Sequence, residues 1–231
     1  MNSSETQYLN MLDQWLKDLP EAESHLLFKE PQKTAILSVD VTNAFCKEGN
    51  LASPRVATII DPIVRLFNLA WQSGVKNIML LQDCHTPEAE EFSAFAPHAI
   101  CGTFEAEAVE EIKSLPFFDQ MTIMAKNSIN PAQATGLNDW LESNSQIHTF
   151  IVVGDCTDIC VYQLAIHLRT YANARDLDWR VIVPEDCVQT YDLPLETASQ
   201  IGAIPHPGDL LHKIFLHHMH LNGVEIVKTV K

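Results

Sequence analysis

The feature that most constrains the fold is a regular alternation of short apolar runs with longer segments of helical periodicity. Strands that alternate with helices of ten or more residues form βαβ units, and these build a parallel sheet covered on both faces. We therefore expect an α/β fold, a three-layer αβα sandwich with a central, mostly parallel six-stranded sheet of Rossmann-like type. The predicted strands cover 34–41, 77–81, 121–125, 148–153, 178–183 and 224–227. Predicted helices cover 62–73, 105–115, 137–145 and 160–174, and two more precede the last strand.

The first 30 residues differ from the rest of the chain. Apolar side chains recur there at helical spacing until Pro20, as in an amphipathic helix. No linker, repeat or low-complexity tract interrupts the remainder. We predict an N-terminal helical extension over 1–30 and a single domain over 31–231.

Charge and hydropathy exclude several classes of protein. The chain has 15 Lys and Arg against 30 Asp and Glu, a formal net charge of -15, so its surface repels nucleic acids and anionic lipids. No apolar run approaches the roughly 20 residues that span a bilayer, and the start MNSSETQYLN lacks the features of a signal peptide. We expect a cytoplasmic protein with a small-molecule partner, no nucleic-acid or membrane partner, and a homo-oligomeric state.

The cysteine content suits an intracellular protein. The expected state is six free thiols, mostly buried as small hydrophobes. The six are Cys46, Cys84, Cys101, Cys156, Cys160 and Cys187.

Three polar residues lie at the ends of three predicted strands. Taken singly, Asp40 suits a turn, Lys126 a side chain that covers apolar surface, and Cys160 a buried structural thiol. Parallel strands, however, bring their carboxyl ends to one edge, where ligands bind. Thr157 and Asp158 are suitable caps for the following helix, and a helix start favours a thiolate at Cys160. The three residues would then be a nucleophile, a base and an electrostatic stabiliser.

The long loop 82–103 carries a second candidate group. Asp83 and His85 lie on one side of an extended segment, and His98 follows further along. A carboxylate and two imidazoles suit zinc, iron or manganese. The plain alternative is three unrelated polar residues, but long loops are usually functional.

Three segments carry a resemblance to a known family. In order and spacing they resemble the signatures of the isochorismatase-like cysteine hydrolases. The resemblance implies Cys160 as nucleophile, Asp40 as proton acceptor and later donor, and Lys126 as their partner. It also implies a cis peptide in the turn, at Asp155–Cys156, with the N–H groups of Cys156 and Cys160 as an oxyanion hole. The segments are VDVTNAFC (39–46), MAKNSIN (124–130) and VVGDCTDICVYQLA (152–165).

The loop narrows the resemblance to the nicotinamidase branch. Its D-x-H and P-H-x-x-x-G-T pattern resembles the motif with which nicotinamidases hold a divalent metal. This implies Asp83, His85 and His98 as ligands, with Glu91 as the fourth, and zinc as the metal, iron or manganese being the alternatives. Two aromatic side chains, Phe45 and Phe95, match positions that stack on the substrate ring, although both also suit an ordinary core. The implied reaction is hydrolysis of nicotinamide to nicotinic acid and ammonia through a thioester.

One segment departs from the family pattern and keeps alternatives open. After Lys126 the chain reads NSINPAQATG, where relatives have a Gly-Phe or Ala-Phe pair. The substrate could instead be another small amide or isochorismate. Two further alternatives are a zinc hydrolase in which Cys160 is only structural, and a non-catalytic binding protein on this fold. Four histidines near the C-terminus, at 212, 217, 218 and 220, suit a solvated helix face or a subunit contact.

Overall fold

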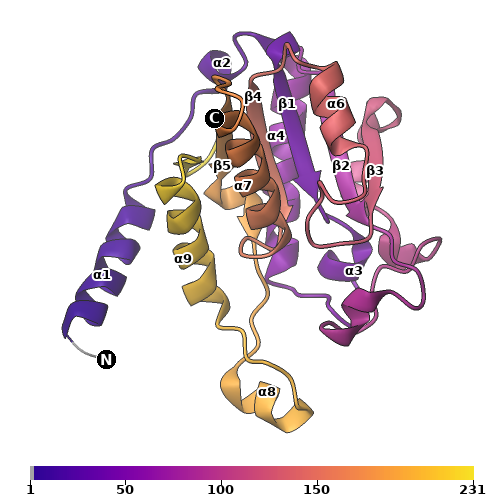
Figure 1. Cartoon of the computed structure of the whole chain (residues 1–231), viewed down its shortest axis with the longest axis vertical. Helices are drawn as coiled ribbons and strands as arrows, with labels where there is room; N and C mark the ends of the chain where they lie inside the picture. The colour runs from indigo at the N-terminus through magenta and orange to yellow at the C-terminus, as the bar shows by residue number, and fades with distance from the viewer. Residues whose placement is uncertain (1–2) are drawn as a thin grey trace.

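A single parallel sheet forms the centre of the computed structural model, which describes residues 3–231 (Figure 1). Six strands lie in the order β3-β2-β1-β4-β5-β7, and a seventh, β6, pairs with β4. Every pairing between these strands is parallel. The predicted architecture is confirmed, and β6 was missed because two residues carry no periodicity. The strands are β1 (Thr34–Val39), β2 (Asn77–Asp83), β3 (Thr122–Lys126), β4 (Thr149–Asp155), β5 (Arg180–Pro184), β6 (Val188–Gln189) and β7 (Glu225–Val227).

Helices cover both faces of the sheet and give the three layers. Neighbouring residues of β1 point to opposite faces, so Ile36 packs in the cluster beneath α4 while Leu37 packs in the cluster beneath α7. The central strands β1 and β4 are buried along their whole length, as parallel strands between two helical layers must be. The helices are α1 (Ser3–Lys17), α2 (Ser24–Leu27), α3 (Asn43–Cys46), α4 (Ile60–Gln72), α5 (Glu110–Lys113), α6 (Leu137–Ser143), α7 (Cys160–Asn173), α8 (Leu195–Ile201) and α9 (Gly208–Leu221).

The helix predicted over 105–115 is wrong for most of its length. Only the four residues of α5 are α-helical, and a 3-10 turn over Phe104–Ala106 precedes them. The intervening backbone pairs instead with the segment after β1: Ala108 bridges Thr42, and the Val109 N–H donates to the Val41 carbonyl. Because these hydrogen bonds are made to another segment, they are lost to a helix.

The N-terminal helix α1 lies beside α9 (Figure 1). The Trp15 ring contacts His217 and His220, and Lys213 Nζ lies 2.6 Å from Asp13 Oδ1. Of the four histidines, His218 and His220 are exposed, as predicted for a solvated helix face, whereas His217 packs against Trp15 of α1 and His212 is buried. The division into 1–30 and 31–231 stays a prediction. No helix within residues 3–231 has the length and apolar character needed to cross a membrane.

Candidate active site

The carboxyl ends of β1, β2, β3 and β4 meet at one edge of the sheet. The register pairs Val39 with Leu81 and with Gly154, and Asp83 with Lys126. The approach of β4 to β1 is close enough to exclude any side chain at position 154: a Cβ on Gly154 (φ +115°) would lie 1.9 Å from the Val39 carbonyl oxygen. The glycine thus allows the two strand ends that precede Asp40 and the Cys156 turn to lie in contact.

Asp40, Lys126 and Cys160 come together at this edge, as predicted. Lys126 Nζ lies 2.7 Å from Asp40 Oδ2 and 3.8 Å from Cys160 Sγ. The three residues are 1%, 2% and 6% exposed, respectively, so the group is almost completely shielded from water. A buried carboxylate and a buried thiol that both contact one ammonium, with atoms within 4.8 Å of each other, can exchange a proton and stabilise charge without competition from solvent.

Lys126 also binds a fourth residue that the sequence assigned only to the metal group. Its Nζ lies 2.5 Å from Asp83 Oδ1, and the Asp83 N–H donates to Asp40 Oδ1 at 2.8 Å. Atoms of Asp40, Asp83 and Cys160 lie within 4.8 Å of one another, but the Lys126 ammonium already binds this set. The set is therefore not a second metal site. Asp83 joins the two candidate groups into one.

The electrostatics of the two carboxyl groups differ. Burial and the nearby Asp83 charge raise the pKa of Asp40 to about 7, although Lys126 opposes the shift. Burial also raises the pKa of Asp83, but the Lys126 charge and the two imidazoles outweigh it and hold that pKa well below its ordinary value. At neutral pH Asp83 is a fixed anion, while Asp40 can take up and return a proton.

The thiol of Cys160 does not behave as the sequence predicted. Burial raises its pKa well above the ordinary value, and the charge of Lys126 lowers it only in part. Burial thus opposes the thiolate that the helix start was expected to favour. A neutral resting thiol needs a base in contact when it attacks, and Asp40 is joined to it through Lys126.

The turn before α7 contains the expected cis peptide bond, Asp155–Cys156. Within residues 3–231, the N–H groups of Cys156 and Cys160 donate to no carbonyl of a turn or loop. The side chains predicted to cap α7 bind histidines instead: Thr157 Oγ1 is hydrogen-bonded to His212, and Asp158 Oδ2 lies 2.8 Å from His206 Nε2. Their side chains make no cap hydrogen bond to α7.

The predicted metal ligands converge. Asp83, His85, Glu91 and His98 each offer one ligand atom, and these atoms all lie within 4.8 Å of one another. The His85 Nδ1–H donates to Asn127 Oδ1 at 2.7 Å, and the His98 Nδ1–H donates to the Ala96 carbonyl at 2.8 Å. Both rings therefore direct Nε2 to the shared centre, and the buried Nε2 of His85 has no hydrogen-bond partner there. An unpaired imidazole nitrogen facing two carboxylates fits a divalent cation.

Three aromatic rings lie against the imidazole of His98. The predicted Phe45 and Phe95 have ring centroids 5.3 and 6.5 Å from it, and Phe92 lies at 5.7 Å. Phe92 was missed by sequence reasoning, although it follows Glu91 directly. Phe45 is buried, whereas Phe92 and Phe95 are only partly buried. An aromatic lining beside a cation site favours a flat ligand that carries a metal-binding atom.

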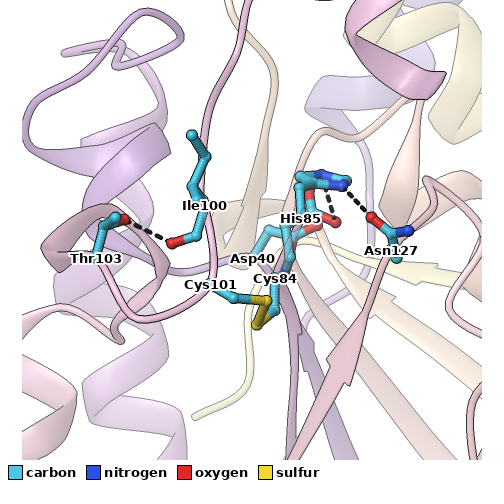
Figure 2. Close-up of a disulfide and its surroundings, with 8 residues drawn as sticks. Asp40, Cys84, His85, Ile100, Cys101, Thr103 and Asn127 are labelled. Carbon is cyan, nitrogen blue, oxygen red and sulfur yellow. Dashed lines mark hydrogen bonds and ion pairs between the residues drawn. A yellow bond between two sulfur atoms is a disulfide. The ribbon is translucent and has the colours of Figure 1, made fainter. Parts of the chain in front are cut away.

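The expectation of six free thiols is wrong. Cys84 and Cys101 form a disulfide, shown beside His85 in Figure 2, and the other four cysteines are free. A local strand-like pairing brings the two together: the His85 N–H donates to Ala99 O, and the Cys101 N–H donates to His85 O. The sequence offered no signal for this pairing because it depends on how the loop folds back on β2.

The segment 127–136 that departs from the family pattern is attached to the metal group. Asn127 holds His85, and the Ile129 N–H donates to Glu91 Oε2 at 3.2 Å. Asn127 was missed because an asparagine one residue after a strand usually serves a turn. The segment that departs from the family pattern therefore lies against two of the candidate ligands.

The chain is similar in sequence or in fold to known proteins. The chain is 29% identical to Nicotinamidase 1 of Arabidopsis thaliana, over 95% of this chain and 96% of that protein. A nicotinamidase of Bacillus subtilis is similar in structure, with a TM-score of 0.62 and 24% identity over 84% of this chain and 99% of that one.

Other solved structures share the fold. An isochorismatase-like hydrolase from Alkaliphilus metalliredigens has a TM-score of 0.65 at 22% identity, covering 85% of this chain and 95% of that one. The isochorismatase domain model matches residues 34–207, which include Asp40, Asp83, Lys126 and Cys160. With its parallel sheet and this match over most of its length, the chain belongs to the isochorismatase family.

Proposed function

We propose that the protein is a cysteine amidohydrolase that converts nicotinamide to nicotinic acid and ammonia. The observation that carries the proposal is that Lys126 and Asp83 join an acid–amine–thiol group to a set of metal-ligand side chains. The first group suits acyl transfer, and the second suits the capture of a ring nitrogen. The similarity to Nicotinamidase 1 over almost the whole of both chains supports the same activity.

Cys160 is the proposed nucleophile. As its Sγ attacks the carboxamide carbon, its proton passes to Asp40, whose raised pKa makes it an effective acceptor. When the tetrahedral intermediate collapses, the C–N bond breaks and Asp40 returns the proton to the departing nitrogen, which leaves as ammonia. A water molecule then attacks the thioester with Asp40 as base, which releases nicotinic acid and restores the thiol.

The developing oxyanion is assigned to the turn before α7. The N–H groups of Cys156 and Cys160 are the proposed donors, and both are without an acceptor among the turns and loops of residues 3–231. Lys126 supplies the fixed positive charge that keeps Asp83 ionised throughout.

Asp83, His85, His98 and Glu91 are the proposed ligands of a divalent metal, zinc first, with iron or manganese as alternatives. These residues would hold the cation, which would supply Lewis-acid chemistry beside the ring nitrogen of the substrate. The protein's own contribution is orientation: Phe45 and Phe95 flank His98 and would contact the faces of the ring, so that the carboxamide is presented to Cys160.

A second candidate is hydrolysis of another small amide by the same residues. The observation in its favour is the segment 127–136, which departs from the family pattern and touches two candidate ligands. The cytoplasmic location and the homo-oligomeric state stay predictions.

Ammonia release from nicotinamide and from benzamide separates these candidates, because the two amides differ only in the ring nitrogen. We expect kcat/KM for nicotinamide to exceed that for benzamide by about a hundredfold or more, as a site built for one polar atom discriminates. Equal rates would contradict the assignment of the ring nitrogen to the metal group. Faster release from a non-aromatic amide would favour the second candidate.

A further inference from the structure

We propose that the Cys84–Cys101 pair is a thiol–disulfide exchange site whose redox state sets the affinity of the neighbouring ligand group for its divalent metal. The inference rests on the metal-binding part of the proposed function. It adds a modification site and a chemical class of reactant, a small dithiol or thiol.

The position of the disulfide relative to the candidate ligands is the first argument. Cys84 lies between Asp83 and His85, and Cys101 follows His98 by three residues. The covalent ring closed by the disulfide therefore contains His85, Glu91 and His98, while Asp83 adjoins it. A bond that closes this ring restricts the separation of the very side chains that must converge on a cation.

The restraints that would remain after reduction are the second argument. After reduction, the segment carrying His98 would still be held by the two backbone hydrogen bonds between His85 and residues 99–101. It would also keep single hydrogen bonds, such as Asn50 Nδ2 to Pro97 O at 2.7 Å and Ala99 N to Glu105 Oε2 at 3.0 Å. Residues 101–104 are all exposed. Reduction would therefore let the ligand side chains move further apart while they stay in the same region. The expected loss of affinity for the divalent metal is about tenfold.

Access to the sulfur atoms is the third argument. Cys101 is exposed and Cys84 is partly buried, and a hollow of about 220 Å³ is lined by Cys84 and by Gly102, the residue after Cys101. Its walls come from the edge strand β3 and from the exposed loop after Cys101, and include Cys84, Gly102, Thr103, Ile123 and Ala125. A small thiol can enter there, whereas Cys160, at 6% exposure, is shielded.

The exchange balances as a two-electron reduction. A thiolate of the dithiol attacks Cys101 Sγ, the S–S bond breaks, and the electron pair leaves on Cys84 Sγ, which takes up a proton. The second thiolate of the reagent then displaces Cys101 and becomes part of the reagent's own disulfide. The protein gains two thiols, and one dithiol is oxidised.

The test measures zinc affinity rather than activity. Zinc-loaded full-length protein, prepared without reductant, is titrated with a chromogenic chelator before and after treatment with a phosphine, since thiol reductants themselves bind zinc. The dissociation constant for zinc should rise about tenfold on reduction. Cys84→Ser and Cys101→Ser should each show the weaker affinity and no response to the phosphine. Cys187→Ser, which replaces a free buried cysteine, should behave as the unmodified protein does.

Several outcomes would overturn the proposal. A change of less than about twofold on reduction would do so, as would weakening by only one of the two serine variants, which would point to that side chain rather than to the bond. Peptide mass spectrometry that finds both thiols free in unreduced protein would also overturn it. If zinc binds equally in the oxidised and reduced states, the redox proposal is wrong but the proposed function stands. If zinc binds in neither state, both the redox proposal and the proposed function are wrong.

Discussion

The proposed catalytic group and the proposed metal-ligand group meet at Asp83, but the fold positions them in different ways. Asp40, Lys126 and Cys160 lie at the ends of β1 and β3 and the start of α7, so the register of the parallel sheet sets their spacing. Of the four metal-ligand residues, only Asp83 belongs to a strand. The other three lie in the loop after β2, which is held by hydrogen bonds and by one disulfide.

The difference indicates which part of the site tolerates change. Moving a strand end would disrupt a buried core, so the distances among Asp40, Lys126 and Cys160 should persist as long as the fold does. Most of the loop between His85 and His98 is exposed, including residues 86–88, 93–94 and 96–97. The proposed metal affinity should therefore respond to single contacts and to redox state. Substitutions in the catalytic group should therefore abolish activity, whereas substitutions in the metal-ligand group should weaken metal binding by different amounts.

Cys160→Ala should have the largest effect. Without the nucleophile, no thioester forms, and ammonia release from nicotinamide should fall by about a thousandfold or more. Zinc affinity should stay within about twofold because Cys160 is not in the ligand set. Cys187→Ala is the matched control and should keep full activity. Activity largely retained by Cys160→Ala would instead support a zinc hydrolase in which this cysteine is structural.

His98→Ala tests the metal-ligand group, whose other members are Asp83, His85 and Glu91. Loss of one imidazole ligand should weaken zinc binding by about a hundredfold while leaving the contacts among Asp40, Lys126 and Cys160 in place. Chelator competition measures the affinity. Reaction of Cys160 with an iodoacetamide should proceed at an unchanged rate, which would show the catalytic group intact. Unchanged zinc affinity would remove His98 from the ligand set.

The pH profile examines the catalytic group alone. Asp40 must be ionised to accept the Cys160 proton, and its pKa is raised to about 7. Below that pH, kcat/KM for nicotinamide should therefore fall about tenfold per unit, and above it should level off. Initial rates at low substrate concentration between pH 5 and 9 give the profile. A constant value down to pH 5 would show that Asp40 is not the base.

Asn127→Ala should have the smallest effect. Removing the acceptor of the His85 Nδ1–H should free that ring to rotate and weaken zinc binding by about tenfold. The catalytic group should be unaffected, so kcat at saturating zinc should change little. Asn144→Ala, at the C-cap of α6 and outside the candidate ligand set, is the matched control. An equal effect of both variants would attribute the loss to general stability.

Much of the candidate site was predictable because it follows from strand order. Parallel strands share a carboxyl edge, so Asp40 and Lys126 could be expected together before any distance was known. Periodicity reports burial along one element, however, and says nothing of hydrogen bonds between elements. For that reason it predicted a helix over 105–115, where the backbone instead pairs with the segment after β1.

The sequence by itself determined the α/β sandwich, the three strand ends and the residue types at the metal group, because these depend on local periodicity and short motifs. Tertiary structure alone decided that Asp83 bridges both groups through Lys126, that Asn127 orients His85, and that Cys84 pairs with Cys101. It also decided the burial of Cys160, which raises the pKa of its thiol while the charge of Lys126 lowers it. Distances between separate elements and the loss of water around a group arise only when the chain is packed.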